Sequence, residues 1–420
     1  MTASNTFIQP PQKMDRIVTL DVLRGFALFG ILYAHMIFWY AAGPLPQETY
    51  QLYKDLGSGI AIGTYMIFIL SKFFAIFSFL FGLSFYIQIQ GLINRQEPVI
   101  SRFGWRLIIL GVIGLLHHTF WRADILSIYV PLGLLLLFLR NLSNKALLII
   151  GGLLVLNIPT KFAELISILL RDKLTLLDFD QKIAGAEYYA ILSEGSFTEM
   201  IKHNIAAMGD KYIYQINSGR LLITLGFFLL GMFAGRMQWF ENVANQATLF
   251  KNVLKKSSWV VAITLLLGVG FGITTFMLEI NVEKTPLAGW LGGFMLEFFN
   301  ASLTLIYITG ISLLMLKPRW PARLMPLAAV GKMALTSYLM QTLFGVFIFF
   351  NIGLGLFTKT SPGTNALLCF AIFGLQILFC RWWLTHFYYG PIEWLWRSAT
   401  DFKWQPLYKG RQTPNSSAVD

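Results

Sequence analysis

Charged residues are scarce in this chain. Asp, Glu, Lys and Arg make up 13% of its 420 residues, whereas hydrophobic residues make up 56%. Soluble globular domains carry about 25% charged residues, so this composition, with a mean hydropathy of +0.61, excludes that class. The signature motifs of soluble enzymes are also missing: there is no P-loop, dinucleotide glycine motif, zinc-ligand spacing or G-x-S-x-G elbow. We expect no metal site.

Cysteine is equally rare. The two cysteines, Cys369 and Cys380, fall in the same apolar run, about three helical turns apart. That separation is too large for a disulfide.

Long apolar runs dominate what is present. The runs that approach the roughly twenty residues needed to cross a bilayer are 17–40, 62–90, 103–121, 125–140, 146–170, 219–239, 257–279, 287–316, 325–351 and 365–389. They predict an all-α polytopic membrane protein, with about ten transmembrane helices forming a single bundle within residues 13–404.

Three polar segments interrupt or flank these runs. Residues 1–12 and 405–420 contain little that could pack, so we expect flexible tails. The first apolar run lacks a small-residue cleavage pattern, and we therefore expect no cleavable signal peptide. Residues 173–218 are too polar to span and are predicted to form an interfacial helical insertion on the outer side.

The formal net charge of +12 could suggest a nucleic-acid partner, but its distribution argues against one. Lys and Arg cluster in alternate connections, which is the positive-inside pattern of membrane proteins. The basic connections and the span ends beside them contain Lys13, Arg16, Arg24, Arg95, Arg102, Arg106, Arg140, Lys145, Arg236, Lys251, Lys255, Lys256, Lys317, Arg319, Arg323, Lys332, Arg397, Lys403, Lys409 and Arg411. The pattern places both termini in the cytoplasm and accounts for the basic charge without nucleic acid.

The first apolar run contains three ionisable residues, Asp21, Arg24 and His35. Helical geometry places them on one face, with Arg24 and His35 about 16 Å apart along the axis. Ionisable groups at membrane depth are costly and usually functional. We expect this face to border a polar cavity rather than lipid.

Arg102 and Arg106 stand one turn apart at the cytoplasmic start of the third run. Two guanidiniums at this spacing could hold phosphate oxygens in bidentate fashion. Ordinary positive-inside anchoring is the alternative.

The third run ends in H-H-T-F-W-R-A-D, which brings His117, His118 and Asp124 to the outer mouth. A histidine beside an aspartate suits a proton relay or a general base. Histidines at a membrane interface are also common, and the doublet alone matches no metal-ligand spacing.

Two further ionisable groups lie within later runs. Glu297 is a lone carboxylate in the eighth run, and Lys332 lies near the cytoplasmic half of the ninth. The default for such groups is a function or a buried partner.

Five segments together resemble one family. They are R-I-V-T-L-D-V-L-R-G-F-A-L-F-G-I-L (16–32), F-S-F-L-F-G-L-S-F (77–85), H-H-T-F-W-R-A-D-I-L (117–126), G-K-M-A-L-T-S-Y-L-M-Q (331–341) and G-P-I-E-W-L-W-R (390–397). The chain resembles the YeiB family of bacterial inner-membrane proteins, domain of unknown function 418. It departs from the family pattern at His35, where asparagine is usual, and at Ala123, where glycine is usual.

That family is similar to the transmembrane acyltransferases, which pass acyl groups from cytoplasmic acyl-CoA to sugars or other acceptors. Those that acetylate surface polysaccharides carry an Arg-x10-His pattern, which Arg24 and His35 match. The resemblance implies a multi-pass protein of the inner membrane that uses acetyl-CoA or another acyl-CoA as donor. It would act on a carbohydrate or lipid-linked acceptor; a homodimer is left open.

In this interpretation the site residues divide into three groups. His35, as general base or acyl carrier, with Arg24 and Asp21 forms the catalytic group. Arg102, Arg106 and Lys332 form the acyl-CoA-binding group. His117, His118, Asp124 and Glu297 line the acceptor side or relay protons.

A proton-coupled transporter using the same buried charges is the competing hypothesis. Broken helices or inverted repeats would favour it, and the sequence shows neither clearly.

Overall fold

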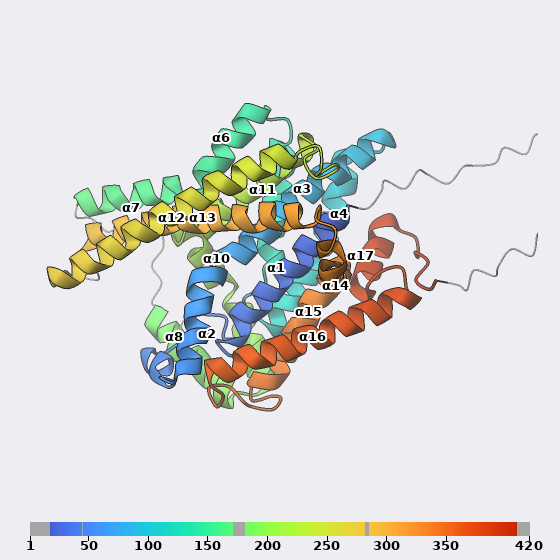
Figure 1. Cartoon of the computed structure of the whole chain (residues 1–420). Helices are drawn as coiled ribbons and strands as arrows, with labels where there is room; N and C mark the ends of the chain where they lie inside the picture. Colours follow the sequence, from blue (N-terminus) through green and yellow to red (C-terminus); the bar gives the residue numbers. More distant parts are fainter. Residues whose placement is uncertain (1–16, 44, 171–180, 282–284, 410–420) are drawn as a thin grey trace, which may run out of the picture.

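The computed structural model describes residues 17–43, 45–170, 181–281 and 285–409, which form an all-α membrane protein (Figure 1). The predicted tail 1–12, residues 410–420 of the predicted tail 405–420, and the start of the insertion, 173–180, lie outside the described residues. Within 405–409, the Tyr388 N–H donates to the Leu407 carbonyl at 2.9 Å and the Lys409 N–H to the His386 carbonyl at 2.8 Å. The helices are α1 (Val18–Met36), η1 (Gln47–Gln51), α2 (Leu56–Thr64), η2 (Tyr65–Ile69), α3 (Lys72–Asn94), α4 (Val99–Phe120), α5 (Leu126–Leu139), α6 (Asn144–Val155), α7 (Ile158–Leu170), α8 (Gln181–Glu194), α9 (Phe197–Ala206), α10 (Met208–Asn217), α11 (Arg220–Arg236), α12 (Ala247–Met277), α13 (Pro286–Leu314), α14 (Trp320–Lys332), α15 (Ala334–Phe349), α16 (Pro362–His386) and α17 (Pro391–Asp401).

The helices confirm a polytopic membrane protein. Among the described residues, six helical segments are long and apolar enough to cross a bilayer, and up to nine if each of three bent pairs counts as one span. The shorter apolar helix α5 matches the predicted run 125–140. Each of the ten predicted runs therefore corresponds to a helix or a helix pair, and the predicted insertion contains α8, α9 and α10.

Three of the spans are bent. The bend is 47° between α6 and α7, 72° between α10 and α11, and 80° between α14 and α15. The first two occur at Asn157 and Gly219, which both have positive φ. Asn157 Nδ2 donates to the Ser218 carbonyl and to Glu297 Oε1, at 3.3 and 3.2 Å. One amide thus links both bends to α13, so tertiary contacts as well as local sequence position them.

Helix α1 lies in the interior of the bundle, against α14, α3 and α16 (Figure 1). Its closest approach to α14 depends on two glycines. A Cβ at Gly331 would collide with the Asp21 carbonyl, and one at Gly25 would collide with the Leu327 carbonyl. Only glycine permits this backbone contact, which fixes the helix that carries Arg24 and His35.

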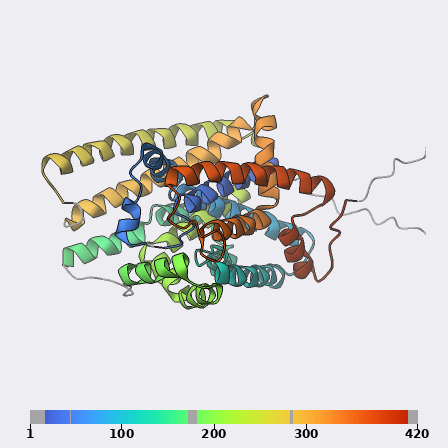
Figure 2. The same ribbon diagram turned by 90° about the horizontal axis from the view of Figure 1, so that it is seen from below.

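Helix α12 lies at the periphery of the bundle, unlike the interior helix α1. Figure 2 shows α12 on the outside of the bundle, lying along α13, and the apolar part of α12 has no buried residues. Most of its side chains face outward and suit contact with lipid. The core lies around α1, α3, α11 and α15. The bundle has one end that carries α17 and another that carries α8 and α9 (Figure 1); these are called the α17 end and the α8–α9 end below.

Candidate functional site

His35 lies toward the α8–α9 end, in an aromatic setting. Its ring centroid is 4.5 Å from that of Trp121, almost perpendicular at 86°, and 5.5 Å from that of Tyr40. Trp121 is fully buried and donates from Nε1 to the Tyr40 carbonyl at 2.9 Å. The loop after α4 therefore holds the indole against α1, while His35 itself stays half-buried.

His117 and Asp124 form a buried pair beside this indole. The distance from His117 Nδ1 to Asp124 Oδ1 is 2.8 Å, and the two residues are 6% and 1% exposed. An ionised carboxylate only accepts, so Nδ1 carries the proton and Nε2 has a free lone pair. Nε2 is buried and has no hydrogen-bond partner among the described residues. This is the arrangement of an oriented general base.

Asp124 is held by more than the histidine. It accepts hydrogen bonds from the backbone N–H groups of Ser127 and Leu126, at 2.7 and 3.2 Å, at the start of α5. Burial pushes the pKa of Asp124 upward, but the hydrogen bond from His117, the charge of Lys211 and the backbone N–H of Ser127 keep the pKa below its usual value. Asp124 therefore stays ionised at neutral pH.

His118 has a different environment from its neighbour. Its Nε2 donates to the Asn204 carbonyl at 2.7 Å, and its Nδ1 accepts from the Lys211 ammonium at 2.9 Å. Lys211 also donates to Ser127 Oγ at 2.6 Å. Both ring nitrogens of His118 are occupied, so this residue ties α4 to α9 and α10, whereas His117 keeps a reactive nitrogen.

Arg220, a cation that the sequence analysis did not single out, is the first residue of α11. Its guanidinium lies over the Phe74 ring of α3 at 4.2 Å. Among the described residues no carboxylate forms an ion pair with it. Its signal was a lone arginine between S-G and an apolar run, at the end where the positive-inside rule predicts few cations.

Lys72 was missed as well. It is 1% exposed, and its ammonium donates to the Met66 carbonyl at 3.3 Å and lies 4.9 Å from the Phe299 ring. It begins α3 directly after Ser71, which has a φ of 67°. The signal was a single lysine within the second apolar run.

Arg24 and Asp21 lie nearer the α17 end, about 16 Å along α1 from His35. Arg24 Nη1 pairs with Asp21 Oδ1 at 2.8 Å, and Nη2 donates to Ser84 Oγ at 2.6 Å. The three residues predicted as one catalytic group therefore occupy two levels of the bundle: an Arg24–Asp21 pair facing α3 and a His35 level facing the loop after α4.

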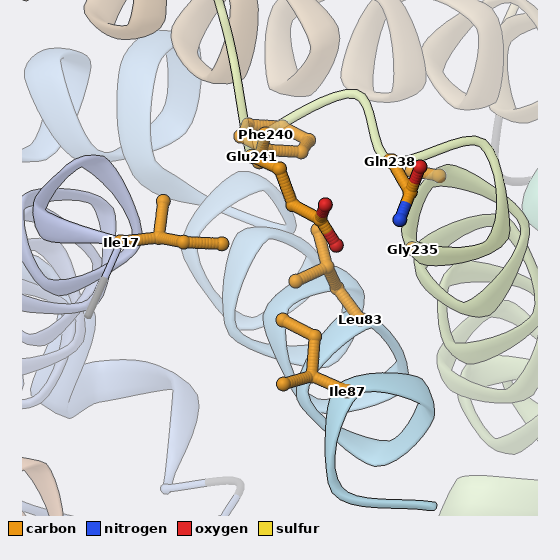
Figure 3. A pocket seen from close by; sticks show the side chains of 8 residues that line it. Ile17, Leu83, Ile87, Gly235, Gln238, Phe240 and Glu241 are labelled. Atoms are coloured by element: carbon orange, nitrogen blue, oxygen red, sulfur yellow. The ribbon is translucent and has the colours of Figure 1, made fainter. Parts of the chain in front are cut away.

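A small pocket lies near the Arg24 level, lined in part by Ile17, Leu83, Gln238 and Glu241 (Figure 3). Figure 3 shows the Glu241 carboxylate directed into it. Its volume of about 10 Å³ holds about one water molecule. It is too small for a substrate.

Arg102 and Arg106, at the α17 end, have different partners. Arg102 pairs with Glu97 at 3.2 Å, whereas the Arg106 guanidinium lies 4.6 Å from the Trp396 ring, and Trp396 Nε1 donates to the Arg106 carbonyl at 3.1 Å. Buried Nε of Arg106 has no hydrogen-bond partner among the described residues. Helix α17 therefore covers the start of α4.

Glu393 was not predicted and explains the 80° bend. Its Oε1 accepts from the backbone N–H groups of Leu335 and Thr336, at 2.6 and 3.1 Å, and its Oε2 accepts from the Thr336 hydroxyl at 2.5 Å. It caps α15 from another helix. Lys332 ends α14 directly before this bend, so α17 lies against both the start of α4 and the α14–α15 bend.

Glu297 shares no described hydrogen-bond partner with the His117–Asp124 pair. Its described hydrogen-bond partner is Asn157, which holds the two helix bends. The charges of Lys161 and Glu164 act on it from α7. This placement supports a structural role at the bends.

A shallow groove of about 500 Å³ lies between α8 and α9, lined by Glu187, Glu199, Lys202 and His203, among others. Behind it, the Arg122 guanidinium lies 3.3 Å from the Tyr188 ring and Nη1 lies 3.4 Å from His203 Nε2. Burial, and then the charge of Arg122, lowers the pKa of His203. Arg122 follows Trp121 directly, so the groove wall connects to the His35 level.

The described residues were also compared with the ligand sets that bind metal ions. Among the described residues, no three His, Cys, Asp or Glu side chains converge as metal ligands.

Comparisons with known proteins identify relatives along nearly the whole chain. The family described as "Protein of unknown function (DUF418)" matches residues 234–403. The chain is 29% identical to the uncharacterized protein YxaH of Bacillus subtilis, over 96% of this chain and 98% of that protein. It is 27% identical to the uncharacterized protein YeiB of Escherichia coli, over 92% and 97%. No solved structure matches the chain.

Proposed function

This chain is a member of the DUF418 family, and we propose that it is a membrane-bound acyltransferase. It would move an acetyl or short acyl group from acyl-CoA to a sugar or other acceptor of the cell envelope. The proposal combines the resemblance of the sequence to the transmembrane acyltransferases with the geometry around His35 and His117.

The observation that carries the proposal is the free Nε2 of His117. Its Nδ1–H is committed to Asp124, and Nε2 is buried with no partner among the described residues. A buried nitrogen without a partner is costly in a finished structure. An acceptor hydroxyl would satisfy it, and the same contact would allow proton removal.

The reaction follows from these groups. As the acceptor oxygen forms its bond to the thioester carbonyl carbon, a histidine takes the hydroxyl proton. The carbon–sulfur bond then breaks, and the CoA thiolate leaves with the proton returned by the imidazolium. His117 is the Asp124-oriented base, and His35, whose ring centroid also lies close to that of Trp121, at 4.5 Å, is the second imidazole that can contact the reacting group.

The donor would enter at the α17 end. Arg102 and Arg106 from α4, with Lys332 at the α14–α15 bend, supply cations for the CoA phosphates. The acyl arm would extend past Arg24 toward His35. Under this proposal the α17 end faces the cytoplasm of a bacterial inner membrane, both termini are cytoplasmic, and the acceptor approaches His35 from the α8–α9 end.

Donor binding tests the first half of the proposal. Purified protein in nanodiscs is titrated with acetyl-CoA and with CoA by calorimetry, and compared with the double variant Arg102→Ala, Arg106→Ala. Arg95→Ala is a matched control, because Arg95 also pairs with Glu97 but is 59% exposed. Saturable binding that only the double variant loses supports the donor site, whereas folded wild-type protein that binds neither compound contradicts it.

A transporter is the second candidate, and the three bent spans favour it. Discontinuous helices often form the substrate site of secondary transporters. Here the bends at Asn157 and Gly219 are joined to the carboxylate of Glu297. In that alternative, Asp21, Arg24, His35 and Glu297 would relay protons rather than catalyse transfer.

Proteoliposomes separate the two candidates. With a pH gradient imposed, a proton-coupled transporter dissipates the gradient when its solute is added, whereas an acyltransferase consumes acetyl-CoA in the absence of any gradient. Acetyl transfer by protein in leak-free vesicles that sustain no coupled proton flux favours the acyltransferase.

A further inference from the structure

The amide side chain at which two of the bent spans meet is satisfied on one side only. Asn157 is 1% exposed, and its Nδ2 donates to the Ser218 carbonyl at the α10–α11 break and to Glu297 Oε1 in α13. Its Oδ1 is buried and has no hydrogen-bond partner among the described residues. A buried amide oxygen without a partner is costly, so this atom is available to a ligand.

A second oxygen lies beside the Asn157 Oδ1 atom. A Cβ at Gly219 would collide with Asn157 Oδ1 and would lie 2.5 Å from Thr160 Oγ1. The amide oxygen and the hydroxyl therefore border the same point, next to the first backbone turn of α11. Two oxygens that each lie about 2.4 Å from one ion can be up to about 5 Å apart. This pair is close enough to bind one ion.

The charged groups around this amide include one carboxylate more than ammonium groups. Lys161 Nζ pairs with Glu164 Oε2 at 2.9 Å, and it would lie 3.0 Å from a Cβ at Gly293, one turn before Glu297 in α13. Trp290 Nε1 donates to the Lys161 carbonyl at 2.8 Å, which holds α7 against α13. Among the described residues, Glu297 forms no ion pair. Because an uncompensated carboxylate within a membrane bundle is costly, one added positive charge is favoured here.

The two helix breaks contribute backbone oxygens. Asn157 and Gly219 both have positive φ, and α6 and α10 end directly before these breaks. The last carbonyl groups of a helix carry partial negative charge. In secondary transporters, unwound carbonyls and the C-terminal ends of interrupted helices coordinate Na⁺. The Ser218 carbonyl occupies such a position.

We infer that Asn157, Thr160 and Glu297, with the Ser218 carbonyl, form a binding site for a monovalent alkali cation. An amide oxygen, a hydroxyl, a carboxylate and a backbone carbonyl are hard oxygen donors of the kind that such cations prefer. The two oxygens that accept from Asn157 Nδ2 keep further lone pairs for an ion. The site is independent of acyl transfer. The cation would join α7, α11 and α13 across the two bends.

Binding of radioactive cations tests the inference without any acyl transfer. Purified full-length protein in phosphatidylcholine nanodiscs is incubated with radioactive sodium in choline chloride, at a pH well above the usual pKa of a carboxyl group. Bound isotope is counted by scintillation proximity. Radioactive rubidium in a second series reports a site that prefers K⁺. We expect saturable binding of at least one isotope, and a higher Tm in the matching alkali chloride than in choline chloride of equal ionic strength.

The variants separate the site from general electrostatics. Glu297→Gln should weaken binding at least tenfold, because it removes the charge but keeps an acceptor for Asn157 Nδ2. Thr160→Val should weaken it several-fold, because it removes one oxygen from a side chain of similar shape. Glu393→Gln is the matched control: Glu393 is also a half-buried carboxylate at a helix bend, but that bend is α14–α15, and binding should not change. Size-exclusion profiles establish that each variant is folded.

Three results would overturn the inference. They are no saturable binding of either isotope, a folded Glu297→Gln protein that binds as tightly as wild type, and displacement by Ca²⁺ far below the concentrations at which alkali cations compete. The last would contradict a site with a single uncompensated charge. Should Glu297→Gln fail to fold, Thr160→Val decides the question by the same criterion. Cation binding in a protein that transfers no acetyl group would refute the acyltransferase and leave this site standing.

Discussion

The carboxylate of Asp124 accepts the Nδ1 proton of His117 at 2.8 Å, and both residues are almost completely buried. This bond fixes the tautomer of the ring and directs the lone pair to Nε2. Because the adjacent His118 uses both of its nitrogens in contacts with Asn204 and Lys211, two consecutive histidines have different chemical capacities. Substitution of His117 and of His118 should therefore have different effects.

His117→Gln should abolish acyl transfer while leaving a folded protein. Loss of a general base typically lowers the rate by about 10² to 10⁴-fold. The variant also loses the Nδ1–H donor to Asp124, but the carboxylate keeps the backbone N–H groups of Leu126 and Ser127 as donors. Initial rates with acetyl-CoA and thermal unfolding of the same preparation measure both effects.

The adjacent variant is the control. His118→Gln should destabilise the protein by about 1 to 3 kcal/mol, because buried groups of Asn204 and Lys211 lose a partner, yet it should keep the chemistry in the folded fraction. Equal losses of activity per folded molecule in both variants would contradict the division of roles.

Asp124→Asn tests the orientation of the base. An amide removes the negative charge that stabilises the imidazolium and permits the other tautomer. We expect a rate lower by about 10² to 10⁴-fold, in line with the loss in comparable histidine–aspartate pairs. Acetyl-CoA affinity should not change, because Asp124 lies at the opposite end of α4 from Arg102. A variant with wild-type rate would show that the carboxylate serves only to start α5.

Gly331→Ala should loosen the contact between α1 and α14. The added methyl group collides with the Asp21 backbone, and overpacking of this kind costs about 1 to 3 kcal/mol. Thermal unfolding in detergent should show a lower Tm. Gly268→Ala is a suitable comparison, because nothing lies within 4 Å of a Cβ at that position, and it should leave the Tm unchanged. A Gly331→Ala protein as stable as Gly268→Ala would rule out the close contact.

Glu393 should make stability depend on pH. Burial raises the pKa of its carboxyl above the usual 4.5, although hydrogen bonds from Thr336 and Leu335 oppose the rise. A raised folded-state pKa means that the stabilisation due to protonation is fully present below about pH 4.5 and is lost as the pH rises through the folded value. Wild type should therefore lose stability relative to Glu393→Gln as the pH rises above 4.5.

The cap itself is tested by truncation. Glu393→Ala leaves two backbone N–H groups of α15 without their acceptor and should cost about 1 to 3 kcal/mol at every pH. Glu393→Gln keeps an acceptor oxygen and should cost less. A difference between wild type and Glu393→Gln that does not vary from pH 4.5 to 7 would contradict the raised pKa.

The spans were predictable because apolar length is a local property of the sequence. All ten runs appear as helices or helix pairs. The bends were not, because their causes lie elsewhere in the chain: Asn157 is held by Glu297, and α15 is capped by Glu393. Neither pairing has a sequence signature, although Glu393 lies within the G-P-I-E-W-L-W-R segment that carried the family resemblance.

The candidate site was predictable in part. His117 with Asp124 follows from a seven-residue spacing across a turn, and His35 from its place in an apolar run. Which histidine of the doublet keeps a free nitrogen depends on α9 and α10, and so could not be predicted. Arg220 escaped notice because the flanks of spans are expected to be polar; only the fold shows that its guanidinium lies over the Phe74 ring of α3.

The most direct test of the account is acetyl transfer by matched proteins. Inverted inner-membrane vesicles that contain wild type, His35→Ala or His117→Gln at equal folded amounts are given radiolabelled acetyl-CoA, and label in the envelope fraction is measured over time. The account predicts incorporation by wild type that both variants lose while still binding acetyl-CoA. Wild-type incorporation by the His35→Ala protein, or none by wild type that binds the donor, would contradict it.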